Sequence, residues 1–137
     1  MSTNILLLKL GGLMHFGILI ASALAPAALN WRENLAPLPK LLRQMFWVYG
    51  AFIVLTIVGF GTLTLFQAER LAAGDSLGRG FCALVALFWA ARLGVQFFVF
   101  DAKPWLTRPL YRWGYHGLTA VFVALVAIYG RAALGVG

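Results

Sequence analysis

The run FCALVALFWAARLGVQFFVF (Phe81–Phe100) decides how this chain folds. It carries one charged residue, Arg92, near its middle. As an α-helix the run is about 30 Å long, which matches the hydrocarbon thickness of a lipid bilayer. We therefore interpret it as a membrane-spanning helix.

Three other apolar runs have the same character. The predicted spans cover residues 5–29, 45–66, 81–100 and 113–130. Prolines, glycines and charged residues interrupt the sequence between them, as expected for connecting loops. The runs are too long and too evenly apolar for barrel strands. We predict an all-α integral membrane protein, a compact up-down bundle of four transmembrane helices, with residues 1–137 forming a single domain.

The composition agrees with this class. Hydrophobic residues make up 62% of the chain and charged residues 11%, and the mean hydropathy is +0.87, whereas soluble domains have about 25% charged residues. The single cysteine, Cys82, excludes an intrachain disulfide, and no Cys/His spacing predicts a metal site. The net charge of +7 is spread over short loops. We therefore expect anionic lipid headgroups, and not nucleic acid, as its partner.

The first run also shows features of a secretory signal peptide. An Ala-Leu-Ala segment precedes Pro26, as a cleavage site would. However, the run is longer than the core of a signal peptide, which has about 7 to 15 apolar residues. We expect a permanent helix here.

The loop charges predict the orientation. With four spans, the first and third loops lie on one side, and six basic residues near them face three on the other. The six are Arg32, Lys40, Arg43, Lys103, Arg108 and Arg112, and the three are Arg70, Arg79 and Arg131. Since cytoplasmic loops carry the excess of Lys and Arg, both termini are expected outside the cytoplasm, in a bacterial inner membrane.

Tryptophans mark the same side. Four of the five lie near the ends of the predicted spans on the basic side: Trp31, Trp47, Trp105 and Trp113. Indole rings are enriched at the boundary between lipid and water. We expect these four residues to act as interfacial anchors.

The third span carries small residues at every fourth position: Cys82, Ala86, Ala90 and Gly94. Such a ridge lets another helix backbone approach closely. We expect it to be a helix-packing surface, and glycines of the second span, such as Gly59 and Gly61, are candidates for the complementary face.

Arg92 raises the question of its counter-charge, because arginine inside a bilayer is costly. The four acidic residues, Glu33, Glu69, Asp75 and Asp101, all lie in predicted loops or at helix ends. Three interpretations stay open. Arg92 extends toward the headgroups, or hydrogen-bonds to neutral groups such as Gln96 and His15, or neutralises an anion from another molecule.

The two histidines raise the possibility of haem. His15 lies ten residues into the first span, whereas His116 lies three residues after Trp113, so their depths differ by about 10 Å. Two axial ligands need similar depths, which leaves only a homodimer that pairs two His15 residues. We predict no cofactor, and expect His15 to donate a hydrogen bond to a neighbouring helix and His116 to belong to the interface.

No catalytic residues can be assigned, because the sequence has no Ser, His and carboxylate set at one depth. We expect a non-enzymatic accessory or scaffold subunit that forms a homo-oligomer or a larger membrane complex. The alternative is a site for haem, quinone or a lipid intermediate, and a further one is a small oligomeric transporter. The candidate ligand or partner site consists of Arg92, Gln96, His15 and His116.

Overall fold

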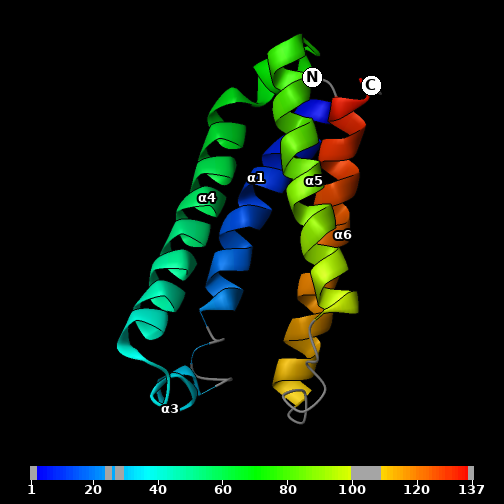
Figure 1. Ribbon diagram of the computed structural model, residues 1–137. Coiled ribbons are helices and arrows are strands. Elements are labelled where there is room, and N and C mark those ends of the chain that lie inside the picture. The colour runs from blue at the N-terminus through cyan, green and yellow to red at the C-terminus, as the bar shows by residue number, and fades with distance from the viewer. Residues whose placement is uncertain (1–2, 24–25, 27–29, 100–108, 136–137) are drawn as a thin grey trace.

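The computed structural model describes residues 3–23, 26, 30–99 and 109–135. Within these ranges the chain is helical and has no strand. Four helices are long and apolar enough to cross a membrane, as predicted: α1 (Thr3–Ser22), α4 (Lys40–Ala72), α5 (Ser76–Phe98) and α6 (Pro109–Ala133). A short helix, α3 (Trp31–Leu35), precedes α4. Figure 1 shows their arrangement.

Helix α5 begins five residues before the predicted span. Asp75 is its N-cap, and its Oδ1 accepts a hydrogen bond from the backbone N–H of Gly78 at 2.7 Å. Gly74 precedes it with a φ of +83°, a conformation that glycine adopts without strain. The helix therefore starts at its cap and not at its first strongly apolar residue.

Helix α4 extends beyond its predicted span, 45–66, at both ends. It starts directly after Pro39. Because proline has no backbone N–H and its ring clashes with the preceding turn, a helix does not run through it from the N-terminal side. Near the other end of α4 the backbone of Gln67 is non-helical, with φ −120° and ψ 21°. The helix thus bends at the residue directly after the end of the apolar run.

The other two spans also differ at their ends from the prediction. Helix α1 ends at Ser22, whereas the predicted span continued to residue 29; residues 24, 25 and 27–29 lie outside the described ranges. Helix α6 starts at Pro109 and ends at Ala133, beyond 113–130 at both ends. A proline fits the first turn of a helix, because the backbone N–H groups of that turn have no acceptor within the helix.

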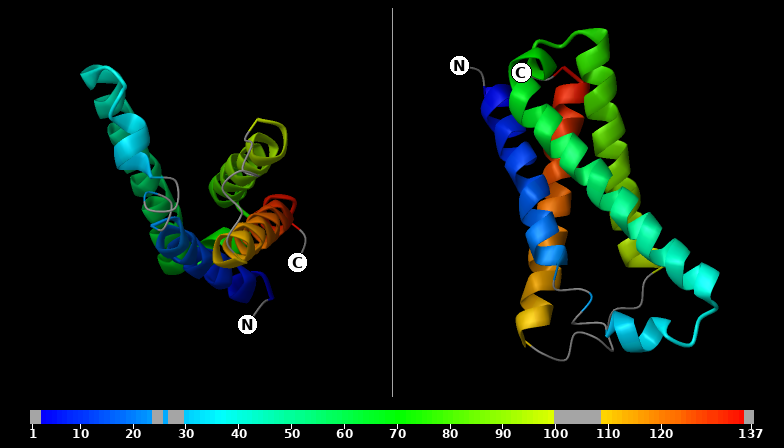
Figure 2. Two further views of the ribbon diagram at one scale, coloured as in Figure 1. Left: turned by 90° about the horizontal axis from the view of Figure 1, so that it is seen from below. Right: turned by 90° about the vertical axis from the view of Figure 1, so that its left-hand side faces the viewer.

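The four long helices form two pairs, α1 with α4 and α5 with α6, and α1 also packs against α6. The start of α1, the α4–α5 turn and the end of α6 lie at one end of the molecule, which we call the turn end (Figure 1). Helix α3 lies at the other, the α3 end. Helices α4 and α5 meet near the turn end and diverge toward the α3 end, as Figure 1 and the left view of Figure 2 show.

Two glycines set the crossing of α1 and α4. A Cβ on Gly61 would lie 2.8 Å from the Phe16 ring and 3.1 Å from the carbonyl oxygen of Gly12. A Cβ on Gly12 would lie 3.1 Å from the carbonyl oxygen of Gly61. Gly61 therefore serves the α1 contact, whereas we expected it to complement the small-residue ridge of α5.

The core lies where the helices meet. Its apolar members are Leu8, Ile18, Ile57, Ala68, Leu71, Cys82, Val85, Trp89, Phe122, Leu125, Ile128, Tyr129 and Ala132. Large apolar side chains also cover much of the outside, among them Leu13, Ile20, Phe52, Leu55 and Leu87. An apolar exterior of this kind suggests a protein embedded in a membrane.

Candidate functional site

His15 lies fully buried where all four long helices meet. Its Nδ1 lies 2.8 Å from the carbonyl oxygen of Gly11, one turn earlier in α1. Its Nε2 accepts a hydrogen bond from the indole Nε1 of Trp89 in α5 at 2.9 Å. Because an indole N–H only donates, Nε2 carries no proton and Nδ1–H donates to Gly11. The two partners hold His15 as one tautomer of the neutral ring.

Aromatic rings enclose the imidazole. The ring centroids of Phe60 in α4, Trp89 in α5 and Tyr129 in α6 lie 6.0, 5.4 and 5.7 Å from that of His15. Each of the other three long helices therefore contributes one ring to its surroundings. His15 acts as a central packing residue as well as a polar one.

A second buried polar pair lies beside it. The hydroxyl groups of Thr64 and Tyr129 are 2.7 Å apart, and Thr64 Oγ1 also donates to the backbone carbonyl of Phe60 at 2.7 Å. Since the threonine hydroxyl has one hydrogen, Tyr129 is the donor of the shared bond. This pair joins α4 to α6, as the His15–Trp89 bond joins α1 to α5.

Arg92 is half-buried on α5 and faces an aromatic ring of α6. Its Cζ lies 5.3 Å from the centroid of the Phe122 ring. Trp89 stacks on the same ring at 5.1 Å with an interplanar angle of 16°. A cation over an aromatic face gains about 0.5 to 2 kcal/mol, depending on desolvation. Phe122 thus connects Arg92 with the Trp89–His15 pair.

Gln96 lies one turn further along α5 and is also directed to α6. Its Nε2 donates to Thr119 Oγ1, and Thr119 in turn donates to the backbone carbonyl of Tyr115 at 2.9 Å. Gln96 is 4% exposed. Gln96 is therefore part of the α5–α6 interface.

The structure brings together some of the predicted site residues. Arg92 and Gln96 share one face of α5, and His15 is connected to Arg92 through Trp89 and Phe122. His116 is exposed on α6 and contacts the ring of Tyr115 in a T-shaped arrangement, with 5.6 Å between ring centroids. His15 accepts the bond from its neighbouring helix, whereas we expected it to donate one. Axial ligation of haem by His15 would require its bond from Trp89 to break.

Arg92 lies further from the middle of its helix than it does from the middle of the predicted span, 81–100. Because α5 covers Ser76–Phe98, its midpoint is Leu87, and Arg92 lies five residues beyond it. This displacement is about 7.5 Å along the helix. Arg92 is therefore in the half of α5 nearer the α3 end, where α4 and α5 have diverged (Figure 2).

The small-residue ridge divides into two parts. Cys82 is fully buried and Ala86 is half-buried, whereas Ala90 is exposed. A Cβ built on Gly94 would meet nothing within 4 Å. The first part packs inside the chain, and the second part is unused by the described residues.

The expected interfacial anchors gather at the α3 end, as far as they are described. Trp31 of α3 contacts Trp47 and Phe46 of α4 edge-on, with ring centroids 5.5 and 4.9 Å apart. Trp113 is 74% exposed. Trp105 lies outside the described residues.

Sequence reasoning missed Trp89, Thr64, Phe122 and Tyr129. One signal was present for Trp89, which is the only tryptophan far from the ends of the predicted spans. The others are ordinary members of apolar helices. Over the described residues, no cluster of three or more His, Cys, Asp or Glu side chains is arranged to hold a metal ion.

Comparisons of this chain with models of protein families, with curated proteins and with solved structures found no match.

Proposed function

We propose that this chain is a non-enzymatic membrane subunit that receives a transmembrane helix of a different polypeptide between α4 and α5. The half-buried Arg92 carries the proposal, because it lies on the α4-facing side of α5 where α4 has diverged. In this proposal the incoming helix supplies a carboxylate to Arg92. The following observations support it.

The side of α5 on which Arg92 lies can be assigned from ring contacts. Phe81 and Phe88 of α5 contact Phe60 of α4 edge-on, with centroids 5.9 and 5.3 Å apart. At about 100° per residue, Arg92 lies within about 40° of both around the helix. It follows Phe88 by one turn. The backbone position of Arg92 therefore continues the α4-facing stripe of α5 beyond its last aromatic contact with α4, and from there its guanidinium extends over the Phe122 ring of α6.

The opposing part of α4 contacts α3 through Phe46 and Trp47. Its first 16 residues, 40–55, include no buried residue. Tyr49, Phe52 and Ile53 are among the exposed side chains there, and aromatic residues are enriched in protein interfaces. Gly50, within this part of α4, would accept a Cβ without contact. This surface can accept another helix closely.

The positive charge of Arg92 determines which kind of partner helix the proposal requires. The acidic residues of the described ranges are Glu33 in α3, Glu69 in the last turn of α4 and Asp75 at the cap of α5. Glu33 lies in α3, and Glu69 and Asp75 lie at helix ends, so the proposal assigns to Arg92 an acidic residue within the span of a partner helix. A partner helix with one Asp or Glu at the depth of Arg92 would form a charge-assisted, bidentate pair.

The proposed setting is a bilayer, with the α3 end in the cytoplasm. Arg32, Lys40, Arg43 and Arg112 lie toward that end together with the exposed Trp47 and Trp113. Basic residues and indole rings mark the cytoplasmic boundary of membrane proteins. The start of α1 and the end of α6 would then face the opposite side.

Gentle extraction with a tagged chain and native mass spectrometry test the proposal. We expect a stoichiometric protein partner, and Arg92→Gln to reduce the bound fraction about tenfold or more, because the partner carboxylate would remain buried and unpaired. Arg92→Lys should retain part of the binding. Arg112→Gln, an exposed arginine toward the same end, is the matched control and should retain all of it.

Other outcomes would replace the proposal. A small lipophilic molecule that is lost in Arg92→Gln, with no protein partner in the wild type, would favour the ligand-site alternative. A homo-oligomer unaffected by Arg92→Gln would also contradict it. The melting temperature of each variant shows whether the fold itself is intact.

A further inference from the structure

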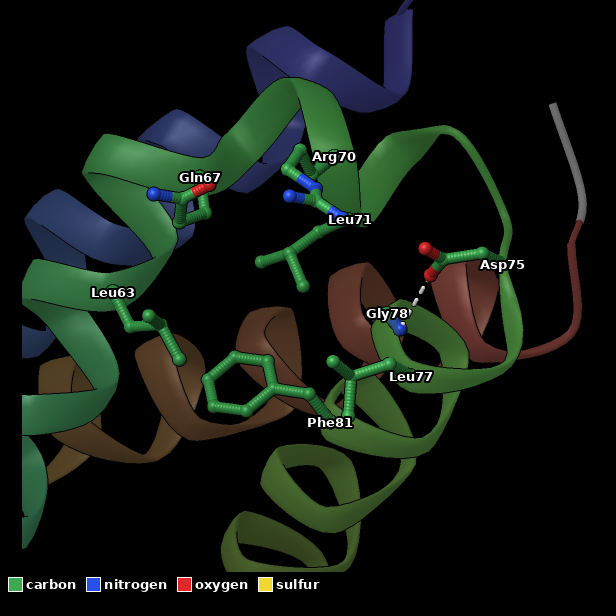
Figure 3. A pocket seen from close by; sticks show the side chains of 8 residues that line it. All are labelled: Leu63, Gln67, Arg70, Leu71, Asp75, Leu77, Gly78 and Phe81. Carbon is green, nitrogen blue, oxygen red and sulfur yellow. Dashed lines mark hydrogen bonds between the residues drawn. The ribbon is translucent and has the colours of Figure 1, made fainter.

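Two adjoining hollows lie at the turn end, far from Arg92. The first, of about 360 Å³, is mostly apolar and is lined by residues of α4, α5 and the turn between them: Leu63, Gln67, Arg70, Leu71, Asp75, Leu77, Gly78 and Phe81. Figure 3 shows the side chains of Leu63, Leu71 and Phe81 directed into one space. Its volume is at the lower end of the range for ligand pockets, about 300 to 1,000 Å³.

The second hollow, of about 320 Å³, is mostly polar. It lies between α1 and the end of α4, and its lining is Lys9, Leu65, Phe66, Gln67, Ala68, Glu69 and Arg70. Gln67 and Arg70 line both hollows. The backbone of Gln67 is where α4 departs from helical geometry, so the two hollows meet at the bend.

The polar groups of this region differ in how they are used. Asp75 caps α5 by accepting a hydrogen bond from the backbone N–H of Gly78, drawn as a dashed line in Figure 3. Arg70 is exposed, and no described carboxylate lies within 4.0 Å of its guanidinium. Lys9 is the other cation of the polar hollow, and Glu69 is its one carboxylate. The polar hollow alone has two cations against one carboxylate, and Asp75 of the adjoining hollow is directed to the N–H groups that begin α5, which offset its charge. An anionic group is therefore favoured in the polar hollow.

The order of polar and apolar groups matches the order within a lipid. Leu63 precedes Arg70 by seven residues, which is about 10 Å deeper along α4. Phe81 lies about 7.5 Å below the start of α5 in the same direction. Leu77, 80% exposed, lies near the pocket mouth. Along α4 and α5, Arg70 and Asp75 therefore lie toward the end of the molecule and Leu63 and Phe81 toward its middle, while Lys9 lies about 9 Å along α1 from its start.

We infer that these hollows together bind one anionic phospholipid of the non-cytoplasmic leaflet. Its phosphate lies between Lys9 and Arg70, and the upper part of an acyl chain lies against Leu63, Leu77 and Phe81. Gln67 offers its amide to the ester region between them. The site is separate from the proposed partner helix, so either can fail without the other.

Native mass spectrometry from nanodiscs of phosphatidylcholine with a minority of phosphatidylglycerol tests this inference. We expect the wild type to retain one phosphatidylglycerol molecule after the annular lipids are lost. The Lys9→Gln/Arg70→Gln variant should lower that retention about thirtyfold. Each of the two cations strengthens the binding of an anionic lipid about five- to sixfold, and the two factors multiply. The control Arg32→Gln/Arg112→Gln, with the same charge change at the α3 end, should retain the lipid.

Two further variants test the inference independently. Glu69→Gln removes the carboxylate of the polar hollow and should increase retention, so the inference remains testable if the double variant does not fold. Leu63→Trp should fill the apolar hollow and reduce lipid retention. Inorganic phosphate, added at millimolar concentration, should not displace the lipid.

Three results would overturn the inference. Equal retention of phosphatidylcholine would show that the site does not select the anionic headgroup. Full displacement by inorganic phosphate, with no effect of Leu63→Trp, would indicate a phosphate site without a lipid chain. Unchanged retention in both the Lys9→Gln/Arg70→Gln variant and Glu69→Gln would exclude this region.

Discussion

At the scale of single residues, the buried polar groups explain how this apolar chain selects one packing. Dispersion alone distinguishes poorly between alternative helix contacts, whereas a buried histidine is satisfied only where a donor meets its Nε2. Trp89 supplies that donor and also stacks on Phe122. The same two residues thus fix the relative positions of α1, α5 and α6.

We predict that Trp89→Phe lowers the free energy of unfolding by about 1 to 2 kcal/mol, because it retains most of the ring but leaves His15 Nε2 buried without a donor. Equilibrium unfolding in detergent micelles measures the change. Trp113→Phe is the control, since Trp113 is 74% exposed and should alter stability little. Equal effects of the two substitutions would show that the His15–Trp89 bond contributes nothing.

Sequence reasoning identified some of these residues and missed their partners. His15 and Arg92 attract notice because a polar group in an apolar run is costly wherever it lies. Phe122 and Tyr129 gave no signal, because an aromatic residue in an apolar helix is equally suited to lipid and to a core. Only the helix pairing decides which of these it contacts.

At the scale of elements, the crossing of α1 and α4 depends on the absence of side chains at Gly12 and Gly61. In a helix, alanine is favoured over glycine by about 1 kcal/mol. At this crossing, however, the new methyl group would lie under 3.0 Å from neighbouring atoms. The local preference and the packing therefore oppose each other.

We expect Gly61→Ala to destabilise the protein, with a melting temperature several degrees below that of the wild type, because backbone of α1 limits how far the helices can adjust. Gly59→Ala, two residues away, has open space around its Cβ. It should leave the melting temperature unchanged or raise it. Thermal unfolding followed by circular dichroism compares the two variants, and the reverse order would contradict the crossing described here.

The number of long helices was predictable, and their ends were not. Hydropathy marks the residues that avoid water, so it found four apolar runs. Helix ends depend instead on caps and backbone geometry, such as Asp75 at the start of α5 and Pro39 before α4. The early start of α5 moves its midpoint to Leu87, so Arg92 lies five residues from the middle of its helix.

At the scale of the whole molecule, the divergence of α4 from α5 separates a region where the four long helices pack together from a region where α4 has no buried residue. Near the turn end all four long helices share the core, whereas toward the α3 end the first half of α4 buries nothing. The sequence contained no sign of this, because α4 is equally apolar along both halves. The pairing of helices depends on which faces fit, and hydropathy does not report that.

We predict that a reporter fused after the last helix is active only when it is a type that works outside the cytoplasm. The basic residues at the α3 end give this orientation, and the end of α6 lies at the opposite end. Paired fusions to a periplasmic enzyme and to a cytoplasmic fluorescent protein measure it. Activity of the cytoplasmic reporter alone would reverse the orientation of the whole bundle.

The enclosed position of Cys82 has a practical consequence. This is the only sulfhydryl of the chain, and its surface is completely covered by neighbouring atoms. Thiol-specific spin labels should therefore leave the wild-type protein unmodified while it is folded. A pair of labels introduced on the facing parts of α4 and α5 would report their separation without any background, in the isolated chain and in its native assembly.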